Sequence, residues 1–198
     1  MTTNTTRDAI IEAADDLFYR QGFEHTSFAD IAEAVDISRG NFYHHFKTKD
    51  DILDAVIASR LAATKDMLER WEIDGATPLE RIDSFIDILI VNRAKIKRFG
   101  CPVGTLCSEL AKLAHPAHGE ANRLFTLFRV WLRRQFDALG RSEDGDQLAM
   151  HLLSRSQGVA TLASAFHDEK FIRQEVEAMR GWLRARIAET APRRRKTN

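Results

Sequence analysis

Three polar side chains in one short stretch of the sequence have the chemistry that reads base pairs in DNA. Arg39 carries a guanidinium that can bond guanine at two acceptor atoms, and Asn41 carries an amide that can pair with adenine. His44 can reach a base edge or a phosphate. Two lysines follow, Lys47 and Lys49, and their ammonium groups are suited to phosphate contact. This combination predicts a nucleic-acid interface.

Capping residues place this stretch on the second of two short helices. Ser27 and Asp30 form a capping box, which predicts the start of the first short helix. Asp36 then lies in a turn where an Asx side chain tolerates left-handed geometry, and Ser38 caps the second helix. Neither short helix buries much surface alone, so both must pack on the helices before and after them. This is the arrangement of a helix-turn-helix, which presents its second helix to a major groove.

Apolar residues recur at helical spacing along nearly the whole chain, and no segment has the alternation of a strand. The predicted fold class is all-α, with about nine helices. We expect a three-helix domain containing the helix-turn-helix over residues 1–50, a larger helical domain over 51–190 and a basic tail over 191–198. Residues 79–97 are expected to form one helix. The four basic residues from Arg193 to Lys196 are expected to be a solvated end, with auxiliary phosphate contact as the alternative.

The net charge of the chain does not by itself indicate binding to DNA. The chain has 44% apolar and 29% charged residues and a net charge of zero. The first fifty residues hold five basic and nine acidic side chains, so DNA binding depends on where the charges lie. The polar start and the lack of a long apolar stretch predict a cytoplasmic protein without membrane contact. Two cysteines suit a reducing compartment.

The run GFEHTSFADIAEAVDISRGNFYHHFKTKDDIL resembles the DNA-binding signature of the TetR family of transcriptional regulators. In that signature a TS-x-x-x-IA helix leads to an S-[KR]-G-x-[LFI]-Y-x-[HY]-F recognition helix and then to an S/T-K-[ED] helix start. The similarity begins at Ile10, and its spacing holds across three helices without a gap. One departure is Asp36, because the family's turn usually carries glycine there. Asp36 can adopt the glycine's geometry, but it adds a carboxylate near the DNA face.

The resemblance implies a role for each matching position. Thr26 and Ser27 would contact phosphate, and Tyr43 would place its hydroxyl on another phosphate. Lys49 would grip the DNA backbone, and Gly40 would allow close approach of the recognition helix. The expected DNA-binding residues are Thr26, Ser27, Ser38, Arg39, Gly40, Asn41, Tyr43, His44, Lys47 and Lys49.

The resemblance also implies a homodimer on a palindromic operator in double-stranded DNA. Two recognition helices must reach successive major grooves, about 34 Å apart. In the TetR family the last two helices form a four-helix bundle with a second copy, and apolar stripes at the end of this chain fit that role. The alternative is a core within one chain. The expected interface residues are Leu152, Val159, Leu162, Phe166, Ile172, Val176, Met179 and Leu183.

Aromatic residues in the middle of the chain exceed what the small N-terminal domain needs, and the resemblance implies that they surround a small-molecule effector. Any single one of them is more often a core residue than part of a ligand pocket. The expected pocket or sensor residues are Trp71, Phe85, Phe99, Cys101, Phe125, Phe128 and Trp131.

Cys101 has a further interpretation. The segment FGCPVGTLCSEL resembles a TetR subgroup, G-C-x-x-G-x-x-x-x-E-L, in which some members respond to electrophiles or oxidants through this cysteine. A thiol at a helix N-terminus has a lowered pKa, and Lys97 and Arg98 add to that tendency. The alternative is a small packed residue.

Other classes of function have weaker support. Cys101, Cys107, His115 and His118 do not have the spacing of a zinc site, so no metal is expected. The two cysteines lie about 9 Å apart on a helix, too far for a disulfide. No catalytic or cofactor-binding motif occurs, so we expect neither an enzyme nor a cofactor. The prediction is a repressor released by a small or electrophilic effector, and a protein-interaction module is the remaining alternative.

Overall fold

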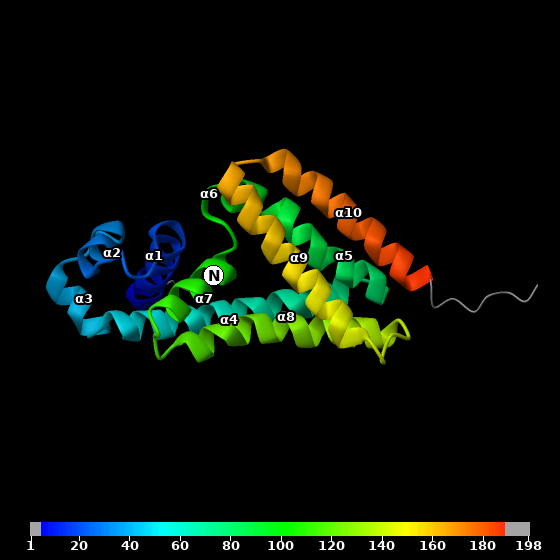
Figure 1. Cartoon of the computed structure of the whole chain (residues 1–198). Helices are drawn as coiled ribbons and strands as arrows, with labels where there is room; N and C mark the ends of the chain where they lie inside the picture. Colours follow the sequence, from blue (N-terminus) through cyan, green and yellow to red (C-terminus); the bar gives the residue numbers. More distant parts are fainter. Residues whose placement is uncertain (1–4, 189–198) are drawn as a thin grey trace, which may run out of the picture. The chain divides into compact units, whose positions relative to one another are not determined.

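The computed structural model describes residues 5–188, except for the side chain of Arg39, and this part of the chain is all-α with no strand (Figure 1). The basic tail falls outside the described residues. The helices are α1 (Thr6–Gln21), α2 (Phe28–Ala34), α3 (Arg39–His45), α4 (Lys49–Asp74), α5 (Pro78–Val91), α6 (Arg93–Phe99), α7 (Pro102–Lys112), α8 (His118–Ala138), α9 (Gly145–Phe166) and α10 (Glu169–Ala188). The predicted fold class is therefore confirmed.

The helix expected over residues 79–97 is divided into α5 and α6 at Asn92. The Asn92 amide nitrogen Nδ2 donates to the carbonyl of Ile88 at 3.0 Å, and the backbone N–H of Asn92 donates to the same carbonyl at 3.1 Å. An asparagine side chain that bonds nearby backbone competes with the helical pattern. Asn92 accordingly leaves helical geometry, with φ −98° and ψ 9°.

The chain divides into two compact units. The first unit contains residues 1–67 and 101–127, and the second contains residues 68–100 and 128–198. Two long helices, α4 and α8, contribute residues to both. This structural division differs from the boundary expected at residue 50, because α7 and the first half of α8 cluster with the helix-turn-helix.

The first unit is built on an apolar core from α1 to α4, α7 and α8. Its buried side chains include Ile10, Phe18, Phe42, Leu53 and Leu110. Side-chain caps fix where its helices begin, because each satisfies backbone N–H groups that the first turn leaves unpaired. The capping residues with their partners are Thr5 with Asp8, Ser27 with Asp30, Ser38 with Asn41, and Thr48 with Asp51.

The second unit packs α5, α6, α9 and α10 around a separate apolar core. Side chains from α5 such as Ile82 and Ile86 are fully buried, as are several from α10. Ion pairs tie the helices together, including Arg93 to Glu169 at 2.7 Å and Arg180 to Asp87. None of the described helices is long and apolar enough to cross a membrane.

Candidate nucleic-acid interface

Helices α2 and α3 pack through one apolar face and leave the other face open. Phe42 of α3 is only 1% exposed, and its ring lies edge-on to Phe28 of α2 with 5.2 Å between centroids. The turn between the helices depends on Asp36, whose φ of 52° is the left-handed geometry that its Asx side chain predicted. Asn41 and His44, on the remaining surface of α3, are exposed.

Seven of the ten expected DNA-binding residues are exposed on the first unit. They are Ser27, Ser38, Gly40, Asn41, Tyr43, His44 and Lys47. A Cβ added at Gly40 would meet no other described part of the chain within 4 Å, so the surface of α3 is open at that point. The side chain of Arg39 falls outside the described residues. These positions form a polar surface on α3 and at the start of α2 that is free to approach a ligand.

Thr26 and Lys49 each bind backbone groups within the protein. Thr26 is 1% exposed, and its hydroxyl donates to the carbonyl of Gly22 at 2.7 Å, so it closes the turn after α1 instead of facing outward. The ammonium of Lys49 donates to the carbonyls of Phe23 and Glu24 at 3.0 and 3.2 Å. Thr26 is buried and Lys49 is half-buried, and both side chains hold the turn between α1 and α2.

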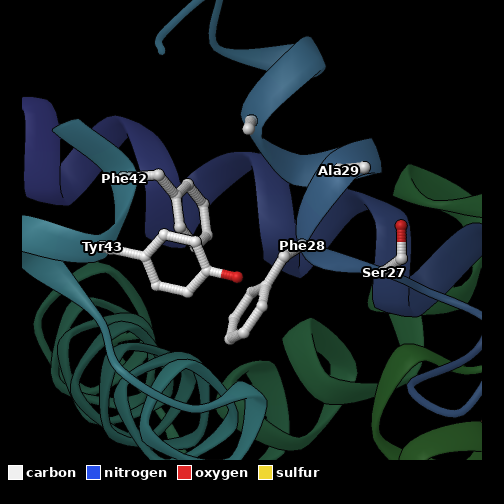
Figure 2. A pocket seen from close by; sticks show the side chains of 6 residues that line it. Ser27, Phe28, Ala29, Phe42 and Tyr43 are labelled. Atoms are coloured by element: carbon white, nitrogen blue, oxygen red, sulfur yellow. The ribbon is translucent and has the colours of Figure 1, made fainter. Parts of the chain in front are cut away.

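A shallow hollow of about 260 Å³ lies between α2 and α3. Figure 2 shows the rings of Phe42 and Tyr43 on α3 facing the ring of Phe28 on α2. Tyr43 is 45% exposed, and its ring lies 5.6 Å from that of Phe28. The lining residues are Ser27, Phe28, Ala29, Ala32, Phe42 and Tyr43. Phe28 is half-buried, and part of its ring borders this hollow.

Carboxylates near the interface remain charged. Hydrogen bonds from the Ser27 backbone and hydroxyl hold the pKa of Asp30 below its usual value. The Thr48 hydroxyl and backbone lower the pKa of Asp51 in the same way. Both carboxylates cap helices, and an anion is favoured at a helix N-terminus. Because these negative charges stay near the interface, DNA binding depends on where individual hydrogen-bond donors lie and not on the net charge of this part of the chain.

The seven expected effector residues are shared between the units. Cys101 and Phe125 belong to the first unit, and the other five belong to the second. In the second unit Trp71 and Trp131 lie 5.6 Å apart, and Phe85 and Phe128 lie 5.7 Å apart. Phe99 is partly buried there. The indole N–H of Trp131 is buried and has no hydrogen-bond partner among the described residues.

The two cysteines differ in environment. Cys101 is the N-cap residue of α7, as the sequence predicted, and its sulfur accepts the N–H of Gly104 at 3.5 Å. It is partly exposed, whereas Cys107 is buried. Burial raises the pKa of the Cys107 thiol to about 11. Among residues 5–188, no three His, Cys, Asp or Glu side chains gather as a metal site would require.

The expected dimer residues are mostly unavailable to a partner. Six of them are at most 3% exposed, because their side chains fill the core of the second unit: Leu152, Val159, Ile172, Val176, Met179 and Leu183. Leu162 and Phe166 on α9 are 45% and 76% exposed. The apolar stripe of α10 is thus a core within one chain, and the free apolar surface of the predicted set is on α9.

The chain is similar to known regulators over its N-terminal part and over its whole fold. A family model described as "Bacterial regulatory proteins, tetR family" matches residues 10–56. An uncharacterized HTH-type transcriptional regulator of Lactococcus lactis is 28% identical over 136 residues, which cover 68% of this chain and 69% of that protein. The regulator TtgR of Pseudomonas putida is 45% identical over 65 residues, covering 33% of this chain and only 30% of TtgR.

A solved structure extends the similarity to nearly the full length. The crystal structure of a TetR transcriptional regulator from Legionella pneumophila aligns with a TM-score of 0.79 and 26% sequence identity. The alignment covers 94% of this chain and 99% of that one. Similarity therefore reaches well beyond the helix-turn-helix.

Proposed function

Because this chain belongs to the TetR family of bacterial regulatory proteins, we propose that it is a sequence-specific transcriptional repressor that an effector releases from its operator. The observation that carries this proposal is the polarity of α3. Its buried Phe42 faces the core, while Asn41 and His44 face outward. The proposal includes no catalytic reaction and no cofactor. A repressor of this kind acts on chromosomal DNA, so its proposed location is the cytoplasm.

Base reading and phosphate contact are assigned to different groups. Asn41 and His44 contact base edges in the major groove, and Arg39 at the start of α3 joins them. The hydroxyls of Ser27 and Tyr43, together with Lys47, contact phosphates and fix the register of the helix on DNA. Gly40 admits the backbone close to the duplex, since its outer side is open.

The proposed dimer places two copies of α3 on one palindrome. The exposed apolar side chains Leu162 and Phe166 on α9 support a second copy of this chain as the partner. Gly158 on the same helix is exposed and a side chain there would meet nothing within 4 Å, so another helix can approach closely. Two half-sites about 34 Å apart would then be read together.

The proposed effector site is the aromatic cluster of the second unit. Trp71 and Trp131 supply flat apolar surface. The indole N–H of Trp131, which has no partner within residues 5–188, is a donor for an acceptor atom of the effector. A small aromatic compound carrying an oxygen or nitrogen acceptor would match the chemistry of these groups. An effector that binds more tightly to a conformation that does not bind DNA would shift the protein toward that conformation. Operator affinity would then fall by as much as the effector's affinities for the two conformations differ.

Cys101 is the proposed target of electrophilic effectors. We expect iodoacetamide at neutral pH to label Cys101 faster than a model thiol, and far faster than Cys107. With a pKa of about 11 the Cys107 thiol is almost wholly protonated at neutral pH, and only a thiolate attacks iodoacetamide. Peptide mass spectrometry over a time course measures both rates, with Cys101→Ser as the control. Labelling of Cys101 no faster than the model thiol would remove the electrophile-sensing part of the proposal.

The experiment that tests the proposed function is selection of fragmented genomic DNA by the purified protein at two salt concentrations. A sequence-specific dimer is expected to recover a short palindrome with spaced half-sites, enriched most strongly at the higher salt because nonspecific phosphate binding weakens there. Recovery of no sequence above background at either salt concentration would contradict the repressor function.

A further inference from the structure

The turn between α1 and α2 is held by a carboxylate that comes from α7. Glu109 accepts the backbone N–H of Phe23 through Oε2 and that of Glu24 through Oε1, each at 2.9 Å. The residues are more than eighty positions apart in the sequence, and all belong to the first unit. Hydrogen bonds from backbone N–H groups to a charged carboxylate are stronger than those between neutral groups.

A cation from α4 completes the arrangement. Lys49 donates to the carbonyls of the same two residues, Phe23 and Glu24, and its ammonium lies 4.3 Å from the centre of the Phe23 ring. The backbone donors of the turn therefore bind an anion, and its acceptors bind a cation. Phe23 itself is 3% exposed, so the turn is also anchored in the core.

Gly22 makes room for the Glu109 carboxylate. Its φ is +91°, which L side chains rarely adopt, and an added Cβ would lie 2.9 Å from Oε1 of Glu109. The carbonyl of Gly22 then accepts the Thr26 hydroxyl at 2.7 Å. Ser27, the N-cap residue of α2, follows directly. Any displacement of the turn is thus passed to the start of α2 within a few residues.

The N-terminal end of α7 is tied to α1 and α4 as well. Arg60 of α4 donates to Asp15 of α1 at 2.5 Å and to the carbonyl of Pro102, the first residue of α7, at 2.7 Å. Its side chain is only 11% exposed. Arg60 therefore links one end of α7 to α1 and α4, and Glu109, near the other end, links it to the turn before α2.

We infer that Glu109 is a positioning residue for DNA recognition: from α7 it fixes the turn that sets the start of α2. The inference has two parts. The functional part, that Glu109 affects operator affinity, rests on the proposed DNA binding. The structural part, that Glu109 holds the turn in place, concerns the free protein alone. Both carboxylate oxygens of Glu109 accept backbone N–H groups of the protein, so its effect on the operator is indirect. In this inference α7 is the element through which a change elsewhere in the chain reaches α2.

Hydrogen exchange of the free protein tests the structural part. Glu109→Gln keeps the side-chain shape but turns one acceptor into an NH₂ group that faces a backbone donor. The amides of Phe23 and Glu24 are expected to exchange about tenfold faster or more, and those of α2 are expected to follow. The matched control is Glu120→Gln, an exposed carboxylate of the same unit whose partner is Arg123. Unchanged exchange at Phe23 and Glu24 would overturn the inference.

Operator affinity of the same variants tests the functional part. Glu109→Gln is expected to bind the selected palindrome about tenfold more weakly, while Glu120→Gln binds as the unmodified protein does. Faster exchange in the turn with unchanged operator affinity would make Glu109 a local cap and would also overturn the inference. If the unmodified protein binds no sequence preferentially, the proposed function fails, and that failure is visible independently of the exchange rates.

A second variant distinguishes the effect of the Glu109 charge from the effect of its side-chain length. Glu109→Asp keeps the carboxylate but shortens the side chain by one methylene. It is expected to accelerate exchange of the two amides by less than Glu109→Gln at low salt, because a charge a little farther away still attracts both donors. An acceleration equal to or larger than that of Glu109→Gln would contradict the role given to the charge.

Discussion

Replacing Asn41 and His44 together by alanine is expected to lower affinity for the selected palindrome by about 100-fold or more. Each good contact to a base edge contributes about 1–3 kcal/mol of discrimination, and 1.4 kcal/mol is tenfold in affinity. Both side chains are exposed, and alanine is the residue that a helix accepts best, so the fold is expected to persist. Affinity for a shuffled duplex is expected to change little, because phosphate contacts carry it.

Fluorescence anisotropy with the two duplexes measures this effect at a fixed salt concentration. The matched control is the double variant His118→Ala with Asn122→Ala, which removes the same two residue types from α8 of the same unit. In the structure these two side chains bond each other at 3.0 Å and are not on α3. Equal losses from both double variants would show that the effect on DNA does not come from the surface of α3.

Replacing Leu162 and Phe166 together by glutamate is expected to produce a monomer. These side chains are 45% and 76% exposed in one chain, so both substitutions lie at the surface of their own unit. Two carboxylates buried against a second copy would be desolvated without a partner. Loss of the dimer removes the effective concentration that links the two half-sites, so affinity for the palindrome is expected to fall about 100-fold or more. Affinity for a single half-site should not change.

Sedimentation velocity gives the oligomeric state, and anisotropy gives the two affinities. Val91→Glu is the control, because Val91 is also 76% exposed in the second unit but belongs to α5 and not to α9. A variant at Leu162 and Phe166 that stays dimeric would place the interface elsewhere. A monomeric unmodified protein would remove the dimer from the proposal.

Local signals allowed the helix-turn-helix to be predicted from the sequence. Ser27 and Ser38 cap α2 and α3 through side chains that bond amides three residues later. Asp36 takes the left-handed turn geometry that its side chain tolerates. These features depend on neighbours within a few residues, so the order of residue types is sufficient to reveal them. The outward polarity of α3 follows from the same spacing.

Long-range partners could not be predicted in the same way. The carbonyls that Lys49 binds lie about 25 positions earlier, so nothing near Lys49 in the sequence distinguishes a DNA contact from an internal one. In the sequence Glu109 stands out only as part of the segment FGCPVGTLCSEL, because its partners are backbone amides of a remote turn. Backbone groups carry no sequence signature, and side chains that bind them are found only when the fold is known.

Apolar stripes are ambiguous for a related reason. Met179 and Leu183 have the helical spacing of an interface, but they are fully buried within their own unit. Phe166 has a similar spacing on α9 and is exposed. A stripe reveals that a helix face is covered, and it does not reveal whether the cover is the same chain or a second copy.

Sequence-specific DNA binding is tested most directly by titrating the unmodified protein onto the selected palindrome and onto a shuffled duplex of equal length and composition. At physiological salt the palindrome is expected to bind about a thousandfold more tightly or more, with two chains per duplex. The affinity for both should fall as salt rises, because bound phosphates release counterions. Equal affinity for the two duplexes would contradict the proposed function.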